Sequence, residues 1–280
     1  DYRLVFRVGD KTYSSNWSQC LRTPEIDSIT YSVKEDLSSL DILVHATGEV
    51  DSLKYYKWDF REDWEFHARW YASAYYDPVQ KIVLKYPEDG SVIPNYYCWD
   101  TALSTDINIY STEPLTENVV KNQKLVTIPN ISLKISYLYS IEVYQKLLSE
   151  EGYKYWETLK KNSDGSSGIF APQPNELKGN IICESDPKEL VLGYISVTTV
   201  ARKRCYIKDT DVKIYKPSYY SGDELTTVDP EMWDSYYTSN WAPVIVDPMT
   251  GAVDWAPRRC VDCRVYGTKE KPSFWPNDHI

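Results

Sequence analysis

The sequence predicts a mainly β protein, in which an immunoglobulin-like or fibronectin-III-like antiparallel sandwich is followed by a mostly β C-terminal domain with one short helix and long loops. Three observations support this class. Period-two alternation dominates the first half of the chain, clusters of turn residues such as 87–90 separate the alternating runs, and a single segment has helical character.

The clearest predicted strand covers residues 56–70. Its even positions are apolar except for Glu62, whereas its odd positions are polar or charged, as in a strand with one buried face. The rings at the even positions are predicted to be core residues: Trp58, Phe60, Trp64, Phe66 and Trp70. Further strands are predicted at 26–33, 41–47, 81–86, 95–99, 106–111, 125–128, 133–143, 180–183, 190–197 and 203–207.

Residues 149–162 are predicted to form the helix. Ser149 is a suitable N-cap, and Glu150 and Glu151 favour the positive N-terminal end of a helix. From 209 to 258 the chain is rich in Pro, Asp, Ser, Tyr and Trp and lacks periodicity. This stretch predicts long loops, and long loops frequently carry binding sites.

We expect three segments along the chain. Residues 1–25 are interpreted as the end of a preceding β domain, residues 26–147 as the β-sandwich, and residues 148–280 as the C-terminal β-rich domain. The first residues alternate like a strand and contain no export signal, so the chain is expected to begin inside a longer protein.

The charge of the chain excludes one class of partner. The formal net charge is −10 at pH 7. Nucleic-acid binding requires a basic surface that neutralises phosphates, so nucleic acid is not an expected partner. No apolar stretch approaches the roughly 18 residues that a membrane-spanning helix requires.

Six cysteines are spread along the chain. Their even number and wide spacing predict disulfide bonds formed in an oxidising compartment. Buried free thiols are the alternative, and the C-x-x-C pair Cys260 and Cys263 also fits a redox dithiol or half of a zinc site. The predicted structural cysteines are Cys20, Cys98, Cys183, Cys205, Cys260 and Cys263.

No pattern predicts catalysis, a metal site or a cofactor. His45 and His67 lie in predicted strands, and no G-x-S-x-G elbow occurs. Asp63 and Glu65 point to the same face of their strand and could act on one substrate as a glycosidase pair. We interpret them, together with Glu62 and the acidic residues of the late loops, as solvated surface groups. The protein is therefore expected not to be an enzyme.

Aromatic residues are unusually abundant, with 25 Tyr, 10 Trp and 5 Phe. Those between 215 and 255 lie in polar sequence without strand spacing, where burial in a core is harder to assume. Rings on loops provide contact area at a small entropic cost, so this cluster is predicted to contact a ligand or partner. Its members are Tyr215, Tyr219, Tyr220, Trp233, Tyr236, Tyr237, Trp241 and Trp255.

Several short motifs occur in the order typical of a known family. They are Tyr55-Tyr-Lys-Trp58, Asp63-Trp-Glu-Phe66, Tyr97-Cys-Trp99, Tyr153-Lys-Tyr-Trp156, Ile169-Phe-Ala-Pro-Gln-Pro174, Val191-Leu-Gly-Tyr194, and Cys260-Val-Asp-Cys263 with Lys271-Pro-Ser-Phe-Trp275. In their order and spacing, the chain resembles the domain of unknown function 4249 family of exported Bacteroidota lipoproteins over nearly its whole length.

This resemblance implies a lipoprotein of the outer membrane, at the cell surface or on the periplasmic face, that helps a TonB-dependent transporter to capture or gate a nutrient. The implied partners are the transporter and a small-molecule, glycan or peptide ligand, and the implied membrane contact is a lipid anchor outside this chain. Two alternatives stay open: a carbohydrate-binding module or glycosidase acting on extracellular glycans, and an adhesin or structural envelope protein.

Overall fold

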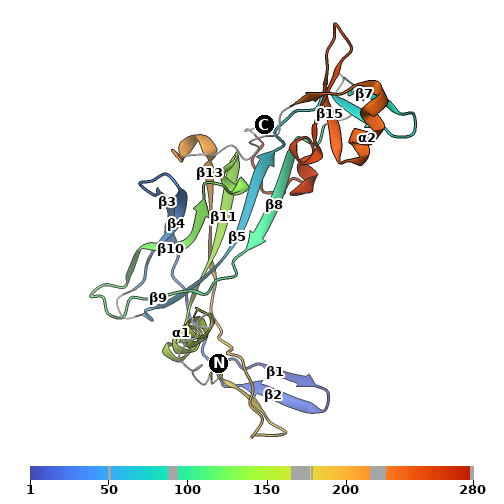
Figure 1. Ribbon diagram of the computed structural model, residues 1–280. Coiled ribbons are helices and arrows are strands. Elements are labelled where there is room, and N and C mark those ends of the chain that lie inside the picture. Colours follow the sequence, from blue (N-terminus) through green and yellow to red (C-terminus); the bar gives the residue numbers. More distant parts are fainter. Residues whose placement is uncertain (50–51, 88–93, 165–176, 178, 215–224, 278–280) are drawn as a thin grey trace, which may run out of the picture.

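The computed structural model describes residues 1–49, 52–87, 94–164, 177, 179–214 and 225–277. The molecule is elongated (Figure 1). Two β-sheets form its middle, and the N-terminal hairpin and α1 (Glu150–Asp164) lie at one end. At the opposite end is a small unit that contains β7 (Ile82–Lys85) and α2 (Trp233–Thr238).

The middle of the molecule consists of two antiparallel sheets. The first has the order β10 (Val119–Pro129), β4 (Ser39–Thr47), β3 (Ile26–Val33). The second has the order β13 (Ala201–Lys208), β11 (Leu138–Leu147), β5 (Tyr55–His67), β8 (Tyr97–Leu103), and β9 (Asn108–Ser111) pairs with the first part of β5. The predicted strands of the first half are thus largely present.

The two sheets enclose one large hydrophobic core. Trp58, Phe60, Trp64 and Phe66 of β5 are buried in it, as their even spacing predicts. Trp70 differs, because β5 ends before it and the chain leaves the sheet. Its side chain is half-buried against a separate small cluster of apolar residues, and its backbone N–H donates to Cys260 O at 2.9 Å.

A three-stranded sheet at the N-terminal end joins distant parts of the chain. Its order is β1 (Val5–Val8), β2 (Lys11–Ser15), β12 (Ile181–Cys183). Beside β12, the backbones of Gly179 and Gly193 meet so closely that a Cβ on Gly179 would lie 1.8 Å from the Gly193 carbonyl oxygen. This contact therefore requires glycine at position 179.

The unit at the other end combines an early hairpin with the late part of the chain. The hairpin is β6 (Ala74–Asp77) with β7, and the late sheet has the order β14 (Thr226–Thr227), β16 (Val253–Pro257), β15 (Trp241–Val246). Short 3₁₀ helices complete the described elements: η1 (Leu133–Ile135), η2 (Asp209–Asp211), η3 (Pro230–Met232), η4 (Arg258–Cys260) and η5 (Cys263–Val265).

Three expectations about local structure are wrong. Residues 209–258 contain α2 and two well-paired strands instead of loops alone, because β15 and β16 pair through a turn in which the Asp247 side chain accepts from two backbone N–H groups. Residues 133–143 do not form one strand, since η1 precedes β11. Residues 190–197 contain no strand, and the Asn180 side chain instead binds the backbone of Ile195.

The mainly β, antiparallel class is confirmed. The immunoglobulin or fibronectin type stays a prediction, as do the segment boundaries. Strands from both sides of residue 147 share sheets and units, since β13 completes the sheet of β11 and the hairpin of β6 and β7 contacts β15. Within the described residues, no helix has both the length and the apolar character needed to cross a membrane.

Candidate ligand-binding site

A small cavity lies in the unit that contains β7 and α2. It has a volume of about 160 Å³ and lies between the β6–β7 hairpin, β15 and the turn at 258–264. Five aromatic side chains line it together with two arginines and one aspartate: Tyr75, Tyr76, Tyr86, Tyr237, Trp241, Arg258, Arg264 and Asp262. Rings and convergent polar groups around one hollow are typical of ligand pockets.

Backbone hydrogen bonds hold the walls of this pocket together. The Ser73 N–H donates to Val244 O of β15 at 2.7 Å, and the Tyr86 N–H donates to Ser73 O at 2.9 Å. The Arg258 N–H donates to Asn240 O, next to β15, at 2.8 Å. The pocket is therefore formed by three chain segments that are tied to one another without a ligand.

The aromatic walls pack against a buried tryptophan. Tyr76 contacts Tyr237 and Trp255, with ring centroids 5.0 and 5.7 Å apart, and Trp255 is fully buried. Tyr236 contacts Trp241 at 5.3 Å. Because their neighbours hold these rings in place, a ligand would meet a preorganised surface.

Charged groups form another side of the pocket. Asp262 accepts from Arg264 at 2.9 Å (Nε to Oδ1) and 2.7 Å (Nη2 to Oδ2). Burial opposes ionisation of Asp262, but the hydrogen bonds from Arg264 lower the pKa of this carboxyl below its usual value. Arg258 is less engaged, since its Nε lies 3.6 Å from Asp262 Oδ2.

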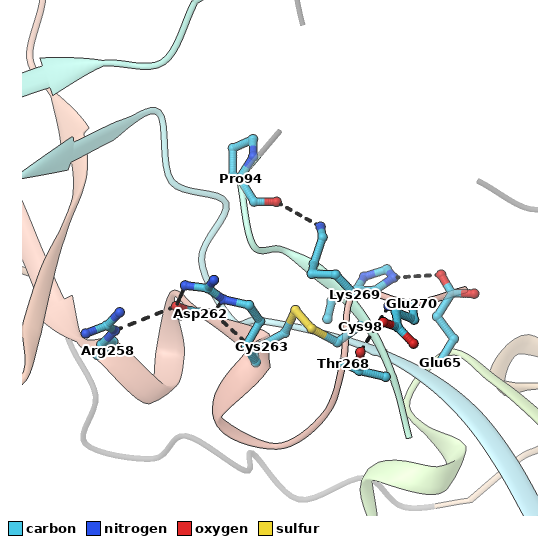
Figure 2. Close-up of a disulfide and its surroundings, with 11 residues drawn as sticks. Glu65, Pro94, Cys98, Arg258, Asp262, Cys263, Thr268, Lys269 and Glu270 are labelled. Carbon is cyan, nitrogen blue, oxygen red and sulfur yellow. Dashed lines mark hydrogen bonds and ion pairs between the residues drawn. A yellow bond between two sulfur atoms is a disulfide. The ribbon is translucent and has the colours of Figure 1, made fainter. Parts of the chain in front are cut away.

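A disulfide anchors the charged side of the pocket (Figure 2). Cys263 directly follows Asp262 and is bonded to Cys98 of β8, 165 residues away in sequence. Cross-linking residues so far apart stabilises a fold by about 3 kcal/mol, mainly by restricting the unfolded chain. The turn that carries Asp262 and Arg264 is therefore covalently tied to the sandwich.

The expectation that all six cysteines form disulfide bonds is wrong. The thiols of Cys20, Cys183 and Cys205 are free, and burial raises the pKa of the Cys205 thiol. Cys263 of the C-x-x-C motif bonds to Cys98 and not to Cys260, which is buried. Among the described residues, no group of His, Cys, Asp and Glu side chains is arranged to hold a metal ion.

The strand carboxylates are not solvated, contrary to expectation. Glu62, Asp63 and Glu65 are all buried. Glu62 is held by Lys134 Nζ at 2.6 Å and by the Tyr139 hydroxyl at 2.8 Å. Around Asp63 and Glu65 the outer face of β5 is covered by Phe274 and Trp275, so the alternation of polar residues there does not indicate exposure.

Asp63 and Glu65 do lie on the same face of β5, but each is engaged within the protein. Arg61 and Arg204 hold Asp63, and the indole N–H of Trp275 donates to Glu65 Oε2 at 2.7 Å. A carboxylate that is committed to a neighbouring cation or donor is poorly suited to act on a substrate. The pair therefore does not form a candidate active site.

The two histidines in strands, His45 and His67, are also engaged by neighbouring side chains. His45 Nε2 lies 2.8 Å from the Thr30 hydroxyl. His67 is surrounded by the rings of Tyr96, Tyr97 and Tyr137, with centroid distances of 4.9, 4.6 and 4.3 Å. Neither histidine lines the pocket.

The structure brings two of the predicted contact residues to the pocket, Tyr237 and Trp241. Trp233 and Tyr236 are half-buried neighbours within the same aromatic cluster, and Trp255 is its buried core. The other three predicted residues lie outside the described part of the chain: Tyr215, Tyr219 and Tyr220.

Sequence reasoning misses the half of the pocket that comes from earlier in the chain. Ala72, Ala74 and Tyr76 are buried while Tyr75 between them is exposed, and this short alternation was the available signal. It also misses the arginines, although Arg258 and Arg264 flank the C-x-x-C motif. Their convergence with the tyrosines depends on pairing between residues more than a hundred positions apart.

A larger groove of about 670 Å³ lies between β9, β10 and the end of α1. Its described lining includes Ile107, Ile109 and Leu125 but no aromatic side chain. It is a gap between the edges of the two sheets, and although Asp106, Lys124 and Lys160 line it, it has neither the rings nor the arginines of the smaller pocket. The smaller pocket is thus the better candidate for a ligand site.

Comparison with known proteins places the chain in a family. A family model described as a domain of unknown function, DUF4249, matches residues 1–204. The chain belongs to the DUF4249 family. This confirms the family inferred from the motifs, over residues 1–204 and not over nearly the whole chain. Neither the curated proteins nor the solved structures contain a match. The DUF4249 match includes the β6–β7 wall of the pocket, whereas β15 and the 258–264 turn lie beyond it.

Proposed function

We propose that this DUF4249 protein is a non-enzymatic accessory lipoprotein of the outer membrane that binds a small nutrient for a TonB-dependent transporter. The observation that carries the proposal is the preformed pocket of rings and arginines at one end of an elongated molecule. The transporter partner and the lipid-anchored location follow from the family resemblance.

The chemistry of the pocket favours binding over catalysis. Among its described lining residues, Asp262 is the carboxylate, and its pKa is lowered through its hydrogen bonds with Arg264. A general acid needs a raised pKa, and a general base needs a carboxylate that is free to accept a proton. Asp262 meets neither need, whereas rings and arginines are well suited to hold a ligand.

Isolation of the full-length protein from native outer membranes tests the proposal. We expect a TonB-dependent transporter to be recovered with it, as identified by mass spectrometry. Uptake of the transported nutrient should fall in cells that carry Trp241→Ala, because this ring lines the pocket. Trp17→Ala is the matched control, since Trp17 is 66% exposed, follows β2 and does not line the pocket. Recovery without any transporter subunit would refute the proposal.

A carbohydrate-binding module is a second candidate, favoured by one observation. The hydroxyl groups of Tyr75, Tyr86 and Tyr237 make no hydrogen bond to another described residue, so rings and hydroxyls are both available in the pocket. Saccharides present apolar ring faces and hydroxyl groups together. Binding of neutral glycans on an array, lost in Trp241→Ala, would support this alternative.

A further inference from the structure

We propose that the pocket selects ligands that carry a carboxylate, and that Arg258 is the residue that binds this carboxylate. This rests on the proposed function, which places a nutrient ligand in the same pocket. The ligand body would be small and partly apolar, as in a single acidic sugar ring or the C-terminal residue of a peptide.

The charges around the pocket do not balance. Two arginines, Arg258 and Arg264, lie with a single described carboxylate, Asp262, and leave one positive charge in excess. The whole chain has a net charge of −10, so this is a local reversal of its overall charge. A cationic hollow in an acidic protein favours an anionic ligand over a neutral one.

Arg258 is the arginine with capacity to spare. Arg264 already makes two hydrogen bonds to Asp262 at 2.9 and 2.7 Å. With the Asn95 amide oriented to face it, Arg264 also donates to the Asn95 oxygen at 3.0 and 3.2 Å. Arg258 makes one ion pair with a described residue, at 3.6 Å, and its side chain is 43% exposed. A guanidinium has five N–H donors arranged in a fork that matches a carboxylate.

The backbone around Arg258 is held in a fixed geometry. Its N–H donates to Asn240 O at 2.8 Å, and its carbonyl oxygen accepts from the N–H groups of Val261 and Asp262 at 3.0 and 2.8 Å. The Cys98–Cys263 disulfide ties the end of this turn to β8. Little ordering of the backbone would therefore be needed when a ligand binds.

The size and walls of the pocket define the rest of the ligand. A volume of about 160 Å³ is below the roughly 300–1,000 Å³ of pockets for drug-sized molecules. One ring or one short side chain fits this volume. Trp241 and Tyr237 provide ring surface on which an apolar part of the ligand can pack. The shared chemistry is a carboxylate on a small, partly apolar body.

Isothermal titration calorimetry with matched pairs of probes tests the inference. Glucuronate is compared with glucose, and the dipeptide Ala-Phe with its C-terminal amide, so that each pair differs mainly in the carboxylate. We expect at least one acid to bind about 10- to 100-fold more tightly than its neutral partner, the range for a charge-assisted hydrogen bond. The pair that responds tells the acidic sugar from the peptide terminus.

Arg258→Gln should remove this preference, so that the acid and its neutral partner bind with similar affinity. Arg258→Lys keeps the charge but loses the fork, and should retain part of the preference. Arg22→Gln removes the same charge at an exposed position outside the pocket and should change nothing. Circular dichroism of each variant verifies that it is folded.

Equal affinity for acid and neutral probes would overturn the inference, as would an acid preference that survives in folded Arg258→Gln. Absence of binding by both acids would overturn it too. None of these results affects the recovery of a transporter from native membranes, which tests the proposed function separately. Failure of the carboxylate inference is thus distinguishable from failure of the accessory-protein proposal.

Discussion

Asp63 on the outer face of β5 lies between Arg61 and Arg204, and Asp262 at the pocket lies between Arg258 and Arg264. The two groups contain the same residue types in the same ratio. The Asp63 group is closed, because Arg204 also pairs with Glu142 at 2.9 Å and both arginines lie against the ring of Phe274.

The Asp262 group stays open, since Arg258 and Arg264 have 43% and 50% of their side chains exposed. No second carboxylate among the described lining residues balances its extra charge. The difference shows that composition does not separate a structural ion-pair group from a binding group. The separation comes from whether the charges balance and whether another part of the chain covers them.

The largest expected effect is the loss of Asp63. Asp63→Ala breaks a buried ion-pair network, because it leaves Arg61 with no described carboxylate partner and the largely buried Arg204 with Glu142 alone. It should lower the free energy of unfolding by about 4 kcal/mol. Asp262→Ala is the matched control and should cost about 1 kcal/mol, because its arginines can be solvated. Urea denaturation followed by circular dichroism measures both. Equal costs would mean that the two groups do not differ as described.

Removal of the disulfide should have the next largest effect. Cys98→Ser combined with Cys263→Ser should lower the free energy of unfolding by about 3 kcal/mol, because the unfolded chain gains freedom. It should also weaken ligand binding, since Asp262 and Arg264 flank Cys263. Cys20→Ser, at an exposed free thiol, is the control and should change neither. Unchanged unfolding in the double variant would contradict the anchoring role.

Trp275 tests whether the C-terminal segment stabilises the buried charges of β5. Trp275→Phe retains a ring but removes the hydrogen bond to the buried Glu65, and should cost about 2 kcal/mol in unfolding free energy. Trp17→Phe, at the exposed N-terminal end, should cost close to nothing. Similar thermal denaturation curves for the two variants would show that the C-terminal segment does not stabilise the charges of β5.

The smallest expected effect is a pH dependence at the open group. The folded-state pKa of Asp262 lies below its ordinary value of 3.8, so its ion pair stabilises the fold above that pH. The contribution is lost as the pH falls through the folded pKa. Lowering the pH from about 5 to about 3 should therefore reduce the free energy of unfolding of the parent more than that of Asp262→Asn, by at most about 1 kcal/mol. Thermal denaturation at each pH measures this difference. Identical pH profiles would contradict this.

Predictability differs between the two faces of β5. Trp58 and Phe66 are predicted core residues and are buried, because alternation in a strand follows from backbone geometry alone. Asp63 and Glu65 have the expected shared face, but their burial cannot be predicted, because the residue that covers Glu65 is 210 positions away. Polarity in a pattern indicates which face a residue occupies and does not indicate whether another segment covers that face.

The candidate pocket also contains residues that the sequence predicts and residues that it does not. Tyr237 and Trp241 are recognised as rings without a place in a patterned strand, and both line it. The contributions of Tyr76 and Arg258 are not recognised, because they depend on the pairing of the β6 segment with β15 and of the 258 turn with Asn240. No local pattern encodes those pairings.

The sequence by itself determined the mainly β class, the family and the core face of the central strand, because each follows from short motifs or from the period of the backbone. Only the tertiary structure decided which carboxylates are buried in ion pairs and which arginine has N–H donors that are available to a ligand. Those outcomes depend on contacts such as Asp63 with Arg204 and Cys98 with Cys263, which join residues far apart in the chain.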